Sequence, residues 1–249
     1  MGIVQGLTEF LPVSSTAHLI LFPWFLSWGG ELDSLSFDVA LHAGTLLALI
    51  ICFWRDWVEI ILKKRKLLGL ILLASVPAGV LGKLFNDLIE SKFRNPSIIC
   101  GSLVVFGIVM YASEKMFKHK KVDDLSIADA LVIGAAQAVA LIPGVSRSGI
   151  TISAGLFRGM ERESAARFSF LLSMPVIAGA TLLHAKKMIF GHEAHNLGMF
   201  AAGVAASAVT GLIAIRFLLS YLREHSVNVF VYYRFALAAV IMAGIWLKG

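Results

Sequence analysis

Two short stretches of the chain carry side chains that could bind and attack a phosphate group. The first, Gln5 to His18 (QGLTEFLPVSSTAH), contains the carboxylate of Glu9 and the hydroxyl of Ser15, and it ends in an imidazole. The second, residues 137–150 (QAVALIPGVSRSGI), begins 132 residues further along and contains Arg147. An acid, a hydroxyl nucleophile, a proton carrier and a guanidinium together would suit phosphoryl transfer.

The two stretches look like copies of one another. When Gln5 is aligned with Gln137, Ser14 falls on Ser146, and each serine follows a valine and, shortly before it, a proline. A duplicated helix-breaking element in an apolar chain is a good indicator of a binding site. The copies differ in their chemistry, because the first has the acid and the imidazole while the second has the guanidinium.

Hydroxyl residues follow each break and therefore open a new half-helix. Such a start presents free backbone N–H groups and the positive end of the helix dipole, which together form an anion site. The alternative is that these serines and threonines only cap the helices. The candidate anion ligands are Gln5, Ser14, Thr16, Ser146, Ser148 and Gly149.

Arg147 is the most informative single residue of the second copy. An arginine at membrane depth costs at least about 2.5 kcal/mol and needs an anionic partner. Its planar fork fits phosphate oxygens with two parallel hydrogen bonds. The alternative is a structural salt bridge to Glu9. Arg147 could have both roles if a ligand or a metal lies between the two residues.

Glu9 and Gln5 are four residues apart, so they share one face of a helix. The Glu9 carboxylate could orient or deprotonate a nucleophile, or help to hold a divalent cation against phosphate oxygens. His18 lies one turn after Ser15 and could carry a proton, unless it is a satisfied core residue. His42, His184 and Glu90 are expected to have structural roles only. Arg234 is expected either to pair structurally or to extend its charged end toward a membrane surface.

The composition indicates a polytopic membrane protein. Of the 249 residues, 58% are hydrophobic and 15% charged, and the mean hydropathy is +0.81, which exceeds what one soluble core uses. The net charge of +6 comes from short clusters between apolar runs. Membrane lipids, and not nucleic acid, are therefore the expected anionic neighbours.

Apolar runs predict an all-α integral membrane fold with six transmembrane helices and two re-entrant helix hairpins. A span needs about 20 helical residues. The hairpins are expected at 1–28 and 127–158, because Pro12 and the pair Pro143-Gly144 interrupt these regions. The six spans are expected at 37–54, 67–85, 97–113, 168–185, 197–217 and 229–247.

Lysine and arginine set the expected orientation. If the basic segment 55–66 is cytoplasmic, 14 of the 22 basic residues lie inside and six lie outside. Residues 1–249 then form one domain in which repeat one (1–113) and repeat two (127–249) have inverted topologies and flank a cytoplasmic linker (114–126). Fewer residues precede Gln5 than Gln137, so we expect the native first half-helix to begin before Met1.

At these residues the chain resembles the undecaprenyl-diphosphate phosphatase family, the bacterial integral-membrane enzymes also known for bacitracin resistance. Residues 5–18 match the first motif of the family, and residues 143–149 (PGVSRSG) match the second. The segment FDVALHAGT at 37–45 is similar too. Gln5 stands where many members have a glutamate, which leaves Glu9 as the main acid.

The resemblance implies hydrolysis of the terminal phosphate of a C55 polyprenyl diphosphate in the bacterial cytoplasmic (inner) membrane. The product is the monophosphate carrier of cell-wall synthesis, and bacitracin resistance would follow. The expected catalytic residues are Glu9, Ser15, His18 and Arg147, with Glu9 as ligand of a divalent cation, Mg²⁺ or Ca²⁺. The site is expected to open to the periplasmic side, and the sequence leaves a homodimer open.

Three alternatives remain at this point. Water could attack the phosphorus directly, with Ser15 only binding phosphate. Inverted repeats with broken helices are also the architecture of secondary transporters, so a lipid-phosphate transporter or flippase would use the same arginine. A scaffold without chemistry of its own would explain the apolar bulk but not the polar residues at membrane depth.

Overall fold

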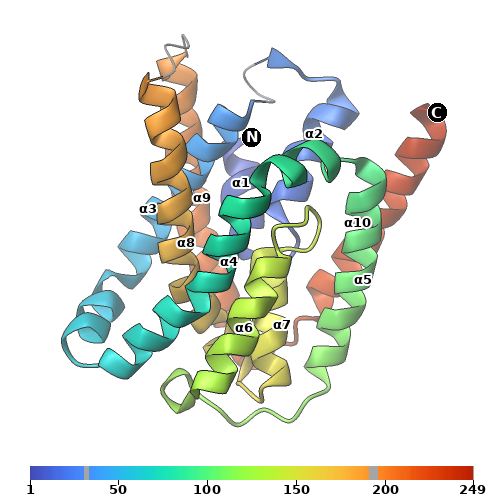
Figure 1. Cartoon of the computed structure of the whole chain (residues 1–249). Helices are drawn as coiled ribbons and strands as arrows, with labels where there is room; N and C mark the ends of the chain where they lie inside the picture. The colour runs from blue at the N-terminus through green and yellow to red at the C-terminus, as the bar shows by residue number, and fades with distance from the viewer. Residues whose placement is uncertain (31–33, 191–195, 249) are drawn as a thin grey trace.

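The computed structural model describes residues 1–30, 34–190 and 196–248, without the side chains of 86–91 and 184–190. Throughout this part of the chain the regular structure is helical, and it contains no strand (Figure 1). Glu90 and His184, for which structural roles were expected, have side chains outside those described.

Six helices are long and apolar enough to cross a membrane, which confirms the six expected spans within the described residues. They extend beyond the apolar runs because helical hydrogen bonds continue past the residues that face hydrocarbon. The expected span 37–54, for example, lies within a 28-residue helix that continues for eight residues beyond it. The six are α3 (Leu35–Leu62), α4 (Arg65–Lys92), α5 (Pro96–Glu114), α8 (Arg162–Phe190), α9 (Leu197–Glu224) and α10 (Asn228–Lys248).

Side chains that accept backbone N–H groups begin several of these helices. Ser34 caps α3 through the Phe37 N–H at 3.1 Å. Asn95 caps α5, and Pro96 at the first helical position is preset for a helix. These caps satisfy donors that the first turn leaves without a partner.

Each of the two interrupted segments forms two short helices. The first contains α1 (Gly2–Phe10) and α2 (Ser15–Leu26), and the second contains α6 (Ile127–Val139) and α7 (Arg147–Phe157). A short 3-10 helix, η2 (Val122–Asp124), precedes α6. In Figure 1 the first pair enters the bundle from the upper end and the second from the lower end, with their breaks near the middle.

The two breaks share the same unusual backbone geometry. Ser14 and Ser146 adopt φ angles of 76° and 72°, a left-handed conformation that non-glycine residues seldom take. Each serine then caps the following helix, with its hydroxyl accepting the N–H of Ala17 or Gly149. The aligned serines of the two copies therefore perform the same structural task.

Gly144 is required at the second break. Its φ is +93°, and a Cβ built at this position would lie 2.8 Å from the carbonyl oxygen of Ile99 on α5. Any larger residue would push the break away from α5. The Pro-Gly pair thus both interrupts the helix and brings its backbone against a neighbouring span.

Each first half-helix packs closely on a helix of the other half of the chain. α1 contacts α9, where a Cβ on Gly2 would lie 2.5 Å from the Gly203 carbonyl oxygen. α6 contacts α4 in the same way, since a Cβ on Gly134 would lie 2.5 Å from the Ala74 carbonyl oxygen. Gly2 and Gly134 are aligned in the two copies, so equivalent glycines make equivalent contacts.

Arg234 of α10 joins the two breaks at the centre of the molecule. Its side chain is 1% exposed, and its guanidinium donates to the carbonyl oxygens of Gly144 at 2.8 Å and Pro12 at 3.4 Å. Further bonds reach the carbonyls of Ser102 and Leu103 on α5. Arg234 thus has a structural role, which it performs through hydrogen bonds to backbone carbonyls. Its side chain does not reach toward a membrane surface.

Candidate active site

The two motifs meet where the breaks face each other. Arg147, the first residue of α7, forms an ion pair through Nη2 with Oε1 of Glu9 near the end of α1. One residue on, the Ser148 hydroxyl donates to the carbonyl oxygen of Leu11 at 3.2 Å. The salt bridge that the sequence offered as the structural alternative is therefore present, within a site that both motifs form.

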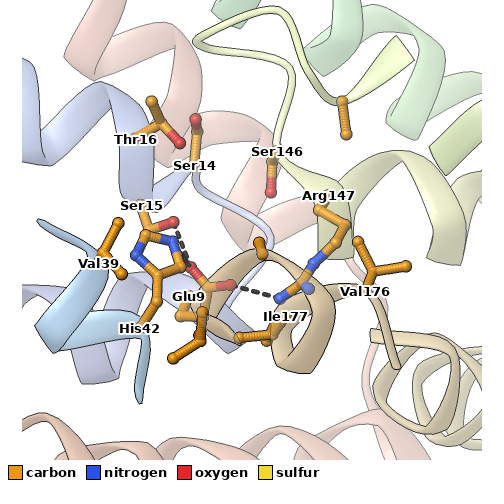
Figure 2. Close-up of a pocket in the computed structure, with 13 residues that line it drawn as sticks. Glu9, Ser14, Ser15, Thr16, Val39, His42, Ser146, Arg147, Val176 and Ile177 are labelled. Atoms are coloured by element: carbon orange, nitrogen blue, oxygen red, sulfur yellow. Dashed lines mark hydrogen bonds and ion pairs between the residues drawn. The ribbon is translucent and has the colours of Figure 1, made fainter. Parts of the chain in front are cut away.

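The second oxygen of Glu9 accepts two further hydrogen bonds. Ser15 Oγ donates to Oε2 at 2.5 Å, and Gln5 Nε2 donates to the same atom at 3.0 Å. The carboxylate is only 6% exposed, so its charge is balanced by Arg147 and its lone pairs are largely used by donors of the site. Glu9 thus faces a hydroxyl on one side and a guanidinium on the other (Figure 2).

Ser15 and Arg147 are presented by the first turns of α2 and α7. Both helices begin at the site, so their positive dipole ends and first-turn N–H groups add to the guanidinium charge. Arg147 uses one nitrogen for Glu9 and another for the carbonyl oxygen of Ser173 at 3.5 Å. A guanidinium has five N–H donors, which leaves donors for a bound anion.

A cavity of about 240 Å³ opens beside these groups. One part of its lining is polar and comes mainly from the two motifs, while the other part is apolar and comes mainly from α3 and α8. This division suits an amphiphile with an anionic head and a hydrocarbon tail. The polar lining residues are Glu9, Ser14, Ser15, Thr16, His42, Ser146, Arg147 and Thr181, and the others are Val39, Ala140, Val176, Ile177 and Ala180.

Residues 1–240 match the protein family described as Bacitracin resistance protein BacA. The chain belongs to this family. The resemblance inferred from the two motifs is thereby confirmed.

Curated relatives match along nearly the whole length of this chain. It is similar to the undecaprenyl-diphosphatase of Thermodesulfovibrio yellowstonii, with 53% identity over 97% of this chain and 93% of that protein. The undecaprenyl-diphosphatase of Moorella thermoacetica is 48% identical over 100% of this chain and 97% of its own length. The undecaprenyl-diphosphatase of Caldicellulosiruptor bescii is 44% identical over 98% of this chain and 94% of its own length.

His18, which was expected to carry a proton, does not line the cavity. It is 4% exposed, and its Nδ1 donates to the carbonyl oxygen of Ser14 at 2.7 Å. Its Nε2 consequently accepts the hydroxyl of Tyr233 at 2.7 Å. In this geometry His18 holds the first break against α10, and both of its nitrogens are in use.

Three predicted anion ligands lie behind the lining residues. The Gln5 amide donates to Glu9 and is not among the residues that line the cavity. Ser148 bonds the Ser146 hydroxyl at 3.2 Å as well as the first break, and the Gly149 N–H donates to the same Ser146 hydroxyl at 3.2 Å. These three residues therefore hold other residues of the site in place through hydrogen bonds. Ser14, Thr16 and Ser146 do line the cavity.

His42 lines the cavity and was not expected there. Its Nε2 lies 3.6 Å from Oε2 of Glu9, and its Nδ1 bonds the carbonyl oxygen of Asp38 at 2.8 Å. The sequence held one weak signal, since His42 lies within the segment 37–45 that resembles the family. As a lone histidine near the start of an apolar span, it had no other feature of a site residue.

Proposed function

We propose that this protein hydrolyses undecaprenyl diphosphate to undecaprenyl phosphate and inorganic phosphate. The observation that carries the proposal is the 2.5 Å hydrogen bond from Ser15 Oγ to Glu9, beside Arg147 and inside an amphiphilic cavity. The names of the curated relatives support the same reaction. The product would return to peptidoglycan synthesis as lipid carrier, and bacitracin resistance would follow from consuming the diphosphate.

The head of the substrate would bind between the two breaks. The free donors of Arg147 would take phosphate oxygens in a bidentate arrangement. The hydroxyls of Ser14, Thr16 and Ser146, together with the first-turn N–H groups of α2 and α7, would supply further donors. These groups also stabilise charge that spreads over the transferred phosphoryl oxygens.

Ser15 would then attack the terminal phosphorus. As the Oγ–P bond forms, the bond from phosphorus to the bridging oxygen breaks, and the Ser15 proton passes to Glu9 Oε2. Water would hydrolyse the phosphoserine in a second step, which returns the proton to Ser15 and releases inorganic phosphate. Direct attack by water, with Glu9 as base, is the competing route.

The prenyl tail would lie along the apolar side of the cavity. Val176, Ile177 and Ala180 of α8 and Val39 of α3 form this side. A tail leaving between these two helices reaches the hydrocarbon of the bilayer without crossing the polar groups. The substrate can therefore bind while most of its chain remains in lipid.

We infer that the two broken segments are re-entrant hairpins of two inverted repeats, and that the site opens to the periplasmic side. The cavity lies near the start of α3 and in the later half of α8. Both positions are toward the helix ends opposite to the basic segment 55–66. By the positive-inside rule, that segment would lie on the cytoplasmic side of a bacterial inner membrane.

A divalent cation, Mg²⁺ or Ca²⁺, would be held by Glu9 together with the substrate. The described residues contain no group of three or more His, Cys, Asp or Glu side chains placed to bind a metal. One carboxylate and several phosphate oxygens are nevertheless a sufficient ligand set for Mg²⁺. The cation would neutralise charge on the diphosphate, while binding and proton transfer remain with the residues named above.

The decisive experiment measures phosphate release from a polyprenyl diphosphate by the purified protein in detergent. We expect turnover with release of one inorganic phosphate for each lipid monophosphate. A lipid-phosphate transporter or flippase with the same architecture would release none. Absence of turnover in a folded preparation supplied with Mg²⁺ or Ca²⁺ would contradict the proposed function.

A further inference from the structure

We propose that Arg234 makes the site selective for a lipid diphosphate over a lipid monophosphate, through an unpaired positive charge held behind the two breaks. The inference rests on the hydrolysis proposed above, and it concerns how the site distinguishes its substrate from its lipid product. Its structural basis is a buried guanidinium that bonds only to carbonyl oxygens among the described residues.

Arg234 has no acidic partner in the part of the chain that the structure describes. Its Nη2 donates to the Gly144 carbonyl at 2.8 Å, and its three longer contacts, at 3.3, 3.4 and 3.5 Å, also end on backbone carbonyls. A guanidinium stays protonated in proteins, and carbonyl oxygens solvate its charge without neutralising it. A charge without a counterion at membrane depth is costly and indicates a functional role.

The helix ends at the breaks do not neutralise this charge either. Each break brings the carboxyl end of one short helix next to the amino end of the following one, α1 before α2 and α6 before α7. The carboxyl end carries about half a negative unit charge and the amino end about half a positive one, so the two ends largely cancel. The charges of Glu9 and Arg147 cancel as well, because these residues form an ion pair. The positive charge that remains is that of Arg234.

The backbone of α7 separates Arg234 from the polar wall of the cavity. A Cβ built on Gly149 would lie 3.4 Å from Nη1 of Arg234 and 3.2 Å from Oγ of Ser146. The Ser146 side lines the cavity, whereas Arg234 is not among the lining residues. The guanidinium therefore lies directly behind the first turn of α7, and it acts on a bound head through its electric field and not by contact.

The surroundings of Arg234 keep this field strong. The side chain is 1% exposed, and Ile99 and Leu103 of the neighbouring helix α5 are fully buried. Water and salt ions are thus kept away from the guanidinium, and a charge in such surroundings is screened much less than one at a surface. The attraction reaches the anion site that the two breaks form.

An unpaired charge at this place favours the more highly charged head. A lipid diphosphate carries more negative charge than the monophosphate that hydrolysis leaves on the lipid. Attraction to a fixed cation grows with the charge of the ligand, so Arg234 stabilises the bound substrate more than the bound lipid product. The same difference helps the monophosphate to leave the site.

The alternative is that Arg234 only holds the two breaks together. In that case its bonds to Pro12 and Gly144 are what matters, and its charge is not. A loss of this anchor displaces the donors of the site and weakens the binding of both lipids alike. A loss of the charge weakens the binding of the diphosphate more, so the ratio of the two affinities separates the two roles.

The test measures how tightly the full-length protein in detergent binds two lipids of equal chain length, a non-hydrolysable prenyl methylene-diphosphonate and the prenyl monophosphate. EDTA is present, so that no divalent cation reduces the charge of either head. Arg234→Gln keeps amide donors for the carbonyls but removes the charge, whereas Arg234→Lys keeps the charge in another geometry. We expect Arg234→Gln to lower the preference for the diphosphonate by at least about tenfold, and Arg234→Lys to keep it within about threefold.

Arg234→Met is a second variant without the charge, and it leaves no polar group to be satisfied in the interior. It should lose the preference as Arg234→Gln does. The matched control is Tyr233→Phe on the same helix, which removes the 2.7 Å hydrogen bond to His18 without a change in charge. Because this bond also holds the first break, the control should change both affinities by a similar factor and keep their ratio.

Three outcomes would overturn the proposal. The first is a preference within about threefold of normal in both Arg234→Gln and Arg234→Met, which would leave only the anchoring role. The second is an equally large loss in Arg234→Lys, which would show that the shape of the guanidinium matters and its charge does not. The third is an unmodified protein without a preference for the diphosphonate in EDTA. If the unmodified protein binds no diphosphonate even with Mg²⁺ and releases no phosphate from a polyprenyl diphosphate, the proposed hydrolysis itself is refuted.

Discussion

Arg147 and Glu9 form an ion pair that connects the first turn of α7 to the end of α1, two segments that are 138 residues apart in the chain. The pair lies beside a cavity, and the guanidinium keeps donors that Glu9 does not use. The same residue therefore joins the two halves and keeps donors available for the anionic head of the proposed substrate. This double role makes its chemistry sensitive to conservative replacement.

Arg147→Lys should lower kcat/KM by about 10²-fold or more in a phosphate-release assay. A lysine keeps the charge but cannot bind Glu9 and a phosphate with a planar fork. Arg223→Lys, on the exposed end of α9, is the control and should change little. Activity of Arg147→Lys within a few-fold of normal would show that the fork is not needed.

Ser15→Ala distinguishes a phosphoserine intermediate from direct attack by water. If Ser15 Oγ is the nucleophile, its removal should reduce turnover by at least about 10³-fold. Rapid acid quenching of the unmodified enzyme with a terminally labelled diphosphate should trap label on the protein. Near-normal turnover by the variant would exclude the covalent route.

Gly134→Ala should destabilise the protein by about 1–3 kcal/mol, because the new methyl group would meet the Ala74 carbonyl of α4 and force α6 outward. Thermal unfolding in detergent measures the effect. Gly79→Ala on α4 is the matched control, since nothing lies within 4 Å of a Cβ at this position. A neutral Gly134→Ala would contradict the close packing of α6 on α4.

Arg234→Met should reduce activity by about 10²-fold although Arg234 is not among the cavity-lining residues. Loss of its bonds to Pro12 and Gly144 leaves the two breaks without their common anchor. A displacement of about 1 Å at a reacting group is enough for such a loss. Phosphate release and thermal unfolding should both decline, while Arg223→Met serves as control.

Removal of divalent cations by EDTA should abolish turnover, and added Mg²⁺ or Ca²⁺ should restore it. Titration calorimetry without a diphosphate should show no cation binding tighter than about millimolar, because one carboxylate is a weak site without phosphate oxygens. Tight binding to the substrate-free protein would place the cation at ligands other than Glu9 and the diphosphate. Full activity in EDTA would show that no cation is required.

Sequence reasoning predicts most of the fold because its signals are local. Apolar length predicts the six long helices, and Pro12 and Pro143-Gly144 predict the breaks. The pairing of aligned serines predicts that both breaks have related roles, which their shared φ angles support. The exact helix ends were missed because hydropathy does not report helical turns beyond the hydrocarbon.

The remaining part of the site depends on contacts between distant segments. His42 becomes a cavity residue only because α3 lies beside α1, and its position in an apolar run gave no sign of this. His18 was placed one turn from Ser15 correctly, but its bond to Tyr233 on α10 removes it from the cavity. The carbonyls that surround Arg234 come from three separate segments and carry no side-chain signal.

The pairing of Arg147 with Glu9 also bears on how the enzyme empties. When phosphate departs, the guanidinium would otherwise remain without a counterion in a low-dielectric interior, and that cost would hold the product in place. The Glu9 carboxylate is paired with Arg147 already and supplies that counterion as the phosphate leaves. Glu9 would thus balance the charge of Arg147 between turnovers, which would favour release of the product over inhibition by it.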